Sequence, residues 1–425
     1  MKKVLLIGFP FPLRPGGSPR LLGLAKYLPK FDWQPVILTA PLDEEYNGTY
    51  RIVETDNRNP LSFWIRLFRL NPDEDVRKQF QQRLNITPGR SFLDRLLTLA
   101  GEFINYPDAD KGWKPFAVKA GDLIINQEDI AAIISTSVPL TGHIVARELK
   151  TRHKIPWIAD LRDLWTQNHN YIYSSLRKLV DKRLELKTLS QADALVTVSQ
   201  PWADKLSALH HKAACAITNG FDPETVNIPS AVLTAKFTIT YTGTIYPENQ
   251  DLSRLFTALS NLISDKTIDP DNIEIRFYGP GADRLDREIK QYGLSSIAIQ
   301  YGQVPRDVAL EKQRESQLLL LLKWEEEQEK GNYPGKAFEY LAAARPILAT
   351  GGSQGDVVDA LLEATGAGIA APTMEDIKRA LVALYRDYQT HGQITYNGLD
   401  SEINKYSHRE MAYKFSRILD HLVPR

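Results

Sequence analysis

The chain of 425 residues has a single cysteine, no net charge and no long hydrophobic run. With Cys215 alone an intrachain disulfide cannot form, which favours a reducing compartment. Lys plus Arg number 52 and Asp plus Glu also number 52, so the basic surplus typical of nucleic-acid-binding proteins is missing. The longest purely aliphatic run is Leu318 to Leu322, far short of the ~20 apolar residues of a membrane span. These absences predict a cytoplasmic protein that does not bind nucleic acid.

Several motifs with a known chemistry are also absent. The eight histidines form no H-x-H or H-E-x-x-H pattern and Cys215 has no C-x-x-C partner, so no zinc site is predicted. The sequence has no P-loop or dinucleotide fingerprint. Asp108-Ala109-Asp110 spells a D-x-D metal motif, but residues 73–75 and 269–271 spell it too, and none of the three follows a strong apolar strand. We therefore interpret this motif as chance.

What the sequence has is an alternation of short apolar runs with amphipathic helical segments along most of its length. Apolar runs without internal alternation are typical of strands buried on both faces, and so of a parallel sheet between layers of helices. The predicted strands are 4–8, 34–39, 130–135, 157–160, 194–199, 214–218, 237–242, 273–278, 297–301, 318–322, 347–349 and 368–370. The fold class is therefore predicted to be α/β, with two doubly wound, Rossmann-like parallel-sheet domains.

The domain limits follow from where this alternation stops. Residues 223–236 contain two prolines and no periodicity, so they are predicted to link a first domain, 1–222, to a second, 237–400. A C-terminal helix is expected within 401–425. Residues from about 43 to 128 are polar and aromatic, which predicts a mostly helical insertion in the first domain.

Two candidate sites lie in the first domain, where ligands are expected at the carboxyl ends of strands. Gly16 and Gly17 follow the first strand and would let backbone N–H groups approach an anionic ligand, although the four surrounding prolines equally fit a stiff turn. Asp160, Arg162 and Asp163 follow the 157–160 strand. We expect at least one of these side chains to contact substrate; the alternative is a structural Arg–Asp ion pair.

The strongest candidate site lies in the second domain, at residues 333–341. Pro334 and Gly335 are predicted to open a helix whose free N–H groups, together with the Lys336 ammonium, would bind phosphate. Glu339, one turn further on, would accept hydrogen bonds from ribose hydroxyls. The alternative for Lys336 and Glu339 is a solvated ion pair. Gly243 and Thr244, at the end of that domain's first strand, form a second glycine turn.

Taken in order, these motifs resemble those of retaining glycosyltransferases of the GT-B fold, in the large family 4, over nearly the whole chain. The matching segments are Gly16-Gly17, 156–165, 192–199, 219–222, 241–244 and 335–341 followed by Arg345-Pro346. The resemblance implies two domains facing a central cleft, with the C-terminal helix crossing back to the first. It implies transfer of a sugar from a UDP- or GDP-type nucleotide sugar to a glycan or lipid-linked acceptor, with retention, in cell-envelope polysaccharide synthesis.

The resemblance also implies roles for individual residues. The diphosphate would bind at Gly335 and Lys336, the ribose at Glu339 and the base near Val304. No cofactor or metal ion would be needed if Lys336 and helix N-termini, with Arg254 or Lys323, offset the charge of the leaving diphosphate. The predicted catalytic residues are Asp163, Lys336 and Glu339, and the other predicted donor-binding residues are Gly16, Gly17, Gly243, Thr244, Val304, Pro334 and Gly335.

Two departures from the family pattern keep other functions open. Gly331 stands where family members often carry a glutamate. That glutamate's contact to the donor sugar is therefore lost or comes from Glu326, Glu327 or Glu329. The loop after Gly243 also lacks the usual basic pair. One rival is a non-catalytic GT-B protein that binds a nucleotide or glycan or acts as a scaffold. The other is a sugar-nucleotide epimerase or phosphorylase on the same architecture.

The insertion raises a separate question about membranes. Phe63, Trp64, Leu67 and Phe68 lie on one face of a predicted helix. We expect this face to pack on the first domain's own sheet. The alternative is peripheral contact with a membrane that carries a lipid-linked acceptor, at the inner face of the plasma membrane.

Overall fold

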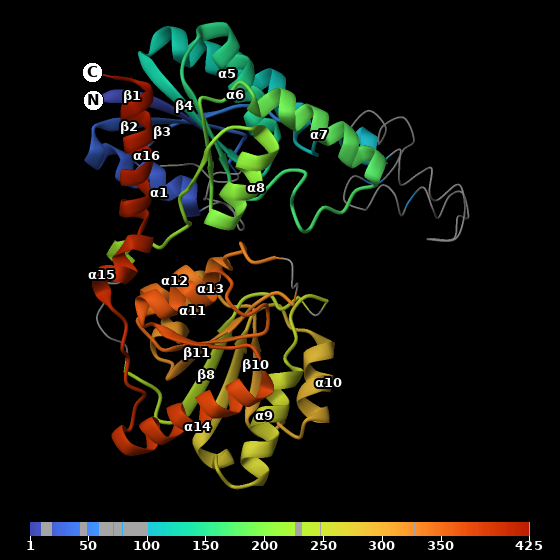
Figure 1. The fold of residues 1–425 in the computed structure, drawn as a ribbon, viewed down its shortest axis with the longest axis vertical. Helices are drawn as coiled ribbons and strands as arrows, with labels where there is room; N and C mark the ends of the chain where they lie inside the picture. The colour runs from blue at the N-terminus through green and yellow to red at the C-terminus, as the bar shows by residue number, and fades with distance from the viewer. Residues whose placement is uncertain are drawn as a thin grey trace. The chain divides into compact units, whose positions relative to one another are not determined.

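The computed structural model describes residues 1–9, 19–42, 49–58, 71, 79, 101–225, 232–246, 248–325 and 329–424. The chain divides into two compact units (Figure 1). Unit 1 comprises Met1–Thr218 and Ala412–Arg425, and unit 2 comprises Asn219–Met411. None of the described helices is long and apolar enough to cross a membrane.

Unit 1 is built on a seven-stranded parallel sheet of order β3-β2-β1-β4-β5-β6-β7. The strands are β1 Lys2–Ile7, β2 Trp33–Thr39, β3 Arg51–Glu54, β4 Ile130–Ser137, β5 Trp157–Leu161, β6 Ala194–Thr197 and β7 Ala214–Ala216. Its described helices are α1 Pro19–Tyr27, α5 Lys114–Gln127, α6 Thr141–His153, α7 Ser175–Leu189, α8 Gln200–His210 and the last part of α16, His408–Leu422. Strand order reverses between β1 and β4, which is where a doubly wound sheet opens its ligand crevice.

Unit 2 has a six-stranded parallel sheet of order β10-β9-β8-β11-β12-β13. The strands are β8 Phe237–Thr242, β9 Ile273–Tyr278, β10 Ala298–Gly302, β11 Leu318–Leu322, β12 Ile347–Thr350 and β13 Gly368–Ala371. The helices are α9 Ser253–Ser264, α10 Asp283–Gln291, α11 Arg306–Arg314, α12 Gly335–Ala343, α13 Val357–Thr365, α14 Met374–His391 and the short α15 Asp400–Ile403. The order here reverses between β8 and β11.

Strand β11 shows why the sheet of unit 2 is covered on both faces. Its five leucines are all buried, and successive side chains of a strand point to opposite faces. Leu318, Leu320 and Leu322 join the core beneath α9 and α14, whereas Leu319 and Leu321 join the core beneath α12 and α13. The two helix layers of Figure 1 follow from this alternation.

The structure confirms the predicted class, two parallel-sheet α/β domains, and corrects its details. Strand β3 pairs with β2 in parallel but was not predicted, because its four residues are at most half-buried at the sheet edge and show little apolar pattern. Helix α5 packs against the sheet core through Ala117 and Val118, so the predicted insertion over 43–128 is too long at both ends. The units divide after Thr218, a few residues before the predicted limit at 222.

The end of the chain packs within unit 1. The Trp33 Nε1 donates a hydrogen bond to the Asp420 carboxylate at 3.0 Å, and the rings of Phe31 and Tyr413 lie 5.5 Å apart. The Arg20 guanidinium lies 5.2 Å from the ring centroid of Phe415. The second part of α16 is therefore part of the first unit's core.

Candidate functional site

The start of α12 in unit 2 is exposed and has the geometry of an anion-binding site. The helix begins at Gly335 after Pro334, and no side chain caps its N-terminus. The first N–H groups of an uncapped helix, together with its dipole, attract negative charge. Gly335 is exposed, and a methyl group added there would meet nothing within 4 Å. A bulky anion therefore has room to approach these N–H groups.

Lys336 adds a cation at the same place. Its ammonium lies 4.9 Å from the ring centroid of Tyr241, and among the described residues no carboxylate comes within ion-pair distance of it. Burial lowers the pKa of Lys336, and the charge of Glu339 offsets part of that effect. A poorly solvated ammonium without a counter-ion is costly in the free protein. An anionic ligand would remove this cost.

Gly243 is required by this arrangement. Its φ is +108°, and an added Cβ would lie 2.5 Å from Cε of Lys336. Only glycine adopts such a backbone without strain and leaves the space that the lysine occupies. The phenol of Tyr241 donates a hydrogen bond to the carbonyl of Thr244 at 2.7 Å, which fixes the ring that faces Lys336. Gly243 and Thr244 thus serve to position the lysine.

Glu339 is paired with a residue that the sequence analysis did not consider. Its Oε1 lies 2.6 Å from Nη2 of Arg306, the first residue of α11. This pair replaces the Lys336–Glu339 ion pair considered as the alternative. Because Arg306 follows the 302–305 loop directly, the pair brings the loop that contains Val304, which is half-buried, to the side of α12. No motif of the sequence includes Arg306; only its position just after Val304, near which the base is predicted to bind, could have drawn attention to it.

The two cations expected to assist Lys336 are occupied elsewhere. Lys323 is buried and its Nζ lies 3.0 Å from Asp356 Oδ2 and 2.6 Å from Asp359 Oδ1. Arg254 lies 3.2 Å from the Glu325 carboxylate and donates a hydrogen bond to the carbonyl of Pro372. Both groups are therefore held by the protein itself.

The structure also places Gly331, which stands where family members often carry a glutamate. The N–H of Gly331 donates a hydrogen bond of 2.9 Å to Glu329 Oε1, and Glu329 is buried. Glu326 and Glu327 lie outside the described residues. Of the three suggested substitutes, only Glu329 can be placed, and its carboxylate binds the backbone of Gly331.

The acidic residues at the end of β5 in unit 1, Asp160 and Asp163, have different surroundings. The Asp160 carboxylate accepts hydrogen bonds from Arg20 at 2.8 and 2.9 Å and from Thr136 at 2.9 Å, and it is fully buried. Arg162 donates to the carbonyl oxygens of Ser137 and Val138. Asp160 is thus the structural ion pair that the sequence left open as an alternative.

Asp163 has no such partner among the described residues. It is half-buried, and desolvation raises the pKa of its carboxyl, against the attraction of Arg162 and His169. Of the charged residues after β5, it is the one whose side chain is available to a ligand. Gly16 and Gly17, the other predicted residues of this unit, lie outside the described residues.

Asp108, in the D-x-D motif interpreted above as chance, has a structural role. Its carboxylate accepts hydrogen bonds from the N–H and hydroxyl of Thr141, both at 2.7 Å, at the start of α6. An acceptor at this place caps the helix. In the part of the chain that the structure describes, no group of three or more His, Cys, Asp or Glu side chains is arranged to hold a metal ion.

Comparison with known proteins identifies the first unit. Residues 16–220 match the family of the glycosyl transferase 4-like domain. These residues form a glycosyl transferase 4-like domain. The match confirms the resemblance predicted from the motifs and the class of enzyme, a glycosyltransferase. No curated relative matches the chain.

Solved structures similar to this glycosyltransferase span both units. Sucrose-phosphate synthase from Thermosynechococcus elongatus is 12% identical with a TM-score of 0.62, covering 99% of each chain. HepE from Anabaena in complex with UDP is 12% identical with a TM-score of 0.61, covering 99% of this chain and 100% of its own. A trehalose-phosphate synthase from Burkholderia xenovorans is 11% identical with a TM-score of 0.58, covering 99% and 100%. At these identities the likeness shows the GT-B fold.

Proposed function

We propose that this glycosyltransferase moves a sugar from a nucleotide-sugar donor, of the UDP or GDP type, to a glycan or lipid-linked acceptor. The observation that carries the proposal is the half-buried Lys336 beside the uncapped start of α12. Its ammonium lies against the ring of Tyr241 and has no carboxylate at ion-pair distance among the described residues. A diphosphate supplies the missing negative charge. Structures of HepE that hold UDP, UDP with glucose, and UDP-glucose support a nucleotide of this kind.

The donor would be bound in unit 2 from phosphate to base. The N–H groups of Gly335 and Lys336 and the Lys336 ammonium would hold the diphosphate and stabilise the negative charge that develops on it as the sugar leaves. Pro334 sets the helix start, and Gly243 and Thr244 keep Lys336 in place. No cofactor or metal ion is required in this scheme.

The nucleoside would lie between α12 and the loop before α11. The Glu339 carboxylate would accept hydrogen bonds from the ribose hydroxyls, and the base would lie along the 302–305 loop with Val304. A carboxylate has lone pairs for several hydrogen bonds, so Arg306 would share Glu339 with the ribose rather than leave it.

The acceptor would be bound by unit 1, with Asp163 as the acid–base group nearest to it. A carboxyl whose pKa is raised by burial exchanges protons more readily near neutral pH than an ordinary aspartate does. Retention at the anomeric carbon, a role in cell-envelope polysaccharide synthesis and a cytoplasmic location at the inner face of the membrane are part of the proposal and derive from the family resemblance.

A thermal-shift screen of UDP, GDP, ADP, TDP and their sugars on the wild type and Glu339→Ala tests the donor site. A ligand at about 100 times its dissociation constant adds ~2.7 kcal/mol to stability. We expect one nucleotide family to stabilise the wild type and to stabilise Glu339→Ala much less. No shift with any nucleotide would contradict the proposal.

A second candidate is nucleotide binding without transfer. Gly331 in place of a family glutamate, and the Glu329 carboxylate turned onto the backbone of Gly331, favour it. The two functions differ in turnover. Release of free nucleotide from a stabilising nucleotide sugar, with sugar gained by an acceptor, supports transfer, whereas binding with no turnover for any acceptor supports the second candidate.

A further inference from the structure

The two central strands of unit 2 part before they end. In these fully described strands, β8 pairs with β11 at positions 239–240 and 318–319, whereas β8 continues to Thr242 and β11 to Leu322. On its other side β8 stays paired with β9 as far as Thr242. The strands therefore part where the strand order reverses, which is where a doubly wound sheet binds its ligand.

Buried side chains replace the hydrogen bonds that the parted strands do not make with each other. The N–H of Thr242 donates a hydrogen bond to the phenol oxygen of Tyr340 at 3.2 Å. The carbonyl of Leu322 accepts a hydrogen bond from Nε2 of Gln250 at 3.0 Å. Tyr340 is 0% and Gln250 7% exposed. Because a buried N–H or carbonyl without a partner is costly, these two side chains stabilise the separation of the strands.

Tyr340 joins α12 to the end of β8. It lies one turn after Lys336, so the two side chains share a face of the helix. Lys336 lies against the ring of Tyr241 and the backbone of Gly243. Tyr340 bonds Thr242, the residue between those two. The first two turns of α12 are therefore attached to the end of β8 at two points.

Gln250 connects the loop after β8 to the same place. Its Oε1 accepts a hydrogen bond from the N–H of Tyr246 at 3.0 Å, while its Nε2 bonds Leu322. Burial raises the pKa of Tyr241, and a hydrogen bond with the Gln250 side chain lowers it in part. One amide thus contacts the loop after β8, the end of β11 and the phenol whose ring faces Lys336.

We propose that Tyr340 and Gln250 are positioning residues for the donor diphosphate, which hold the end of β8 against the start of α12 and so keep Lys336 in its binding position before a ligand arrives. A group that is already in position loses less conformational entropy when the ligand binds. The inference rests on the proposed donor site and deepens it, because both side chains act through Lys336 and not on the nucleotide.

The chain offers a matched control for each residue. Tyr385 of α14 is 2% exposed, and its phenol accepts a hydrogen bond from the N–H of Asp269 at 3.2 Å. Gln317, just before β11, is 1% exposed. Its Nε2 donates to the carbonyl of Thr234 at 2.9 Å, and its Oε1 accepts from the N–H of Ile394 at 3.1 Å. These side chains make the same kinds of hydrogen bond but join neither α12 nor the turn after β8.

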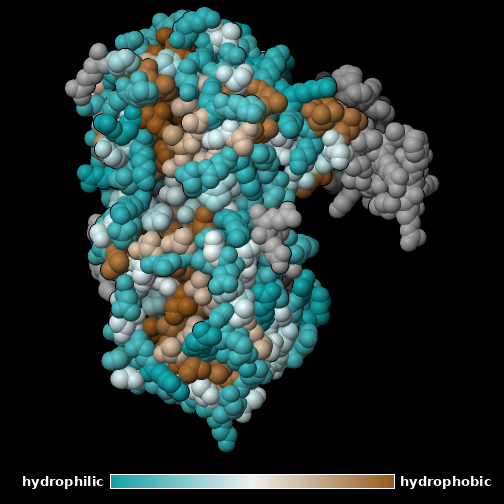
Figure 2. Space-filling model, in the orientation of Figure 1, coloured by the Kyte–Doolittle hydropathy of each residue, from teal (hydrophilic) through white to brown (hydrophobic). Residues whose placement is uncertain are grey.

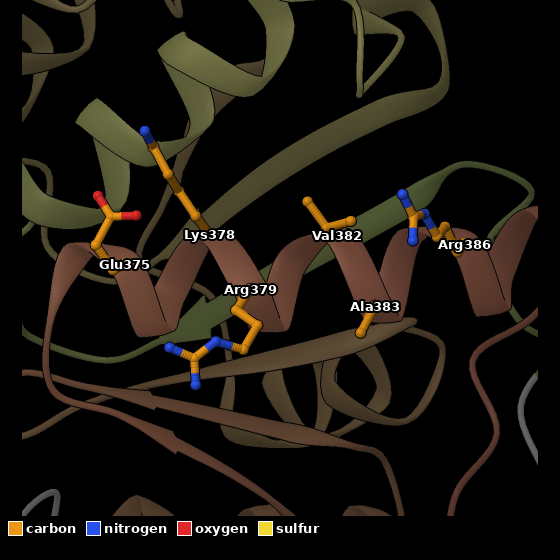
Figure 3. Close-up of a pocket in the computed structure, with 6 residues that line it drawn as sticks. All are labelled: Glu375, Lys378, Arg379, Val382, Ala383 and Arg386. Atoms are coloured by element: carbon orange, nitrogen blue, oxygen red, sulfur yellow. The ribbon is translucent and has the colours of Figure 1, made fainter.

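The outer surface of α14 provides a third control, because it is another place in unit 2 where an anion could bind. A hollow of about 430 Å³ there is lined by Glu375, Lys378, Arg379, Val382, Ala383 and Arg386 (Figure 3). A glutamate stands among these cations, and the Arg379 guanidinium lies 3.4 Å from the Asp376 carboxylate. Hydrophilic residues cover most of the surface of unit 2 that Figure 2 shows. The hollow thus belongs to an ordinary solvated surface.

Isothermal titration of UDP into the full chain tests the inference. We expect Tyr340→Phe and Gln250→Met each to weaken UDP binding by about three- to tenfold, the contribution of one hydrogen bond. Tyr385→Phe, Gln317→Met and Lys378→Gln/Arg379→Gln/Arg386→Gln should bind UDP like the wild type. In urea unfolding, each positioning variant and its matched control should lose similar stability, because each pair loses the same kind of buried hydrogen bond.

The pH dependence of UDP binding separates positioning from a general loss of stability. Burial lowers the pKa of Lys336, and the diphosphate binds its ammonium form. A less constrained Lys336 gains water, so in Tyr340→Phe its pKa should move back toward the ordinary value. The fall of UDP affinity with rising pH should then shift to higher pH, whereas Tyr385→Phe should keep the wild-type profile.

Two results would overturn the inference and leave the proposed donor site intact. One is wild-type UDP affinity and pH profile in both Tyr340→Phe and Gln250→Met. The other is an equal loss of UDP affinity in Tyr385→Phe and Gln317→Met. No UDP binding by the wild type would overturn the proposed function and the inference together. Circular dichroism of each variant checks its fold.

Discussion

Two lysines of unit 2, the buried Lys323 and the half-buried Lys336, have opposite surroundings. Lys323 follows β11 and lies within 3.0 Å of the carboxylates of both Asp356 and Asp359. Lys336, at the start of α12, faces an aromatic ring and has no carboxylate at ion-pair distance among the described residues. A buried cation with its own counter-ions holds the fold together. A partly desolvated cation without one is available to a ligand.

The same contrast separates two aspartates of unit 1. Asp160 receives a bidentate hydrogen bond from Arg20, whereas Asp163, three residues on, has no partner among the described residues and a pKa raised by burial. In these two comparisons the paired charge belongs to the structure and the unpaired one to the candidate site. The predictions below test whether this distinction holds.

The largest effect is expected from Lys323→Met. Removing the lysine leaves the buried Asp356 and the half-buried Asp359 without their counter-ion, and breaking a buried pair typically costs ~3–5 kcal/mol. Urea unfolding followed by circular dichroism measures the change. Lys336→Met is the matched control, because it removes a half-buried ammonium that has no counter-ion among the described residues, and it should leave the stability equal or slightly higher. Equal losses of stability in the two variants would contradict the claim that Lys323 and Lys336 differ in their counter-ions.

Asp163→Asn should affect catalysis and spare the fold. If Asp163 acts on the acceptor, its amide should lower the rate of sugar transfer by about 10²-fold without changing UDP affinity. The raised pKa means that the folded state disfavours the carboxylate. The resulting loss of stability is absent at low pH, and it develops as pH rises from the pKa of the unfolded chain to the raised pKa of the folded state. The neutral amide should therefore be at least as stable as the wild type at neutral pH. A large loss of stability would show that Asp163 is structural instead.

Gly243→Ala should disturb Lys336 through space alone. The added methyl would lie 2.5 Å from the Lys336 Cε, at a φ of +108° that L side chains rarely adopt. We expect a loss of about 1–3 kcal/mol in stability and weaker UDP binding. Gly293→Ala is a control, because its φ is also positive but nothing lies within 4 Å of the added methyl. A similar loss of UDP affinity in both would contradict the proposed contact.

The smallest effect is expected from Arg306→Gln. Arg306 is largely exposed, and such pairs contribute about 0–1 kcal/mol. The stability should hardly change, and UDP should still bind because Glu339 remains. If Arg306→Gln abolishes UDP binding while Glu339→Ala does not, the guanidinium rather than the carboxylate holds the nucleoside. Calorimetric titration of both variants separates these cases.

The sequence was enough to predict the features that depend on residues close together in the chain. The leucine run of β11, the helix start at Gly335 and the cation beside it can be recognised within a few positions. Contacts between distant residues could not be recognised: the Lys323 pairs with Asp356 and Asp359, and the Arg306–Glu339 pair, join separate elements. The four-residue edge strand β3 is too short and too exposed to show a pattern. In α7, Arg177 and Asp181 are buried whereas Leu176 and Leu179 are exposed. This could not be predicted, because periodicity reveals two helix faces but not which one is buried.

Isothermal titration of UDP into the wild type and Lys336→Met tests the central claim most directly. We expect the substitution to weaken binding by at least about tenfold, since a charged hydrogen bond contributes ~1.5–3 kcal/mol. The wild-type affinity should also fall as pH rises through the lowered pKa of Lys336, because the ligand binds the ammonium form, and Lys336→Met should lack this pH dependence. Equal affinities in the two proteins would contradict the claim that Lys336 is held unpaired for a nucleotide diphosphate.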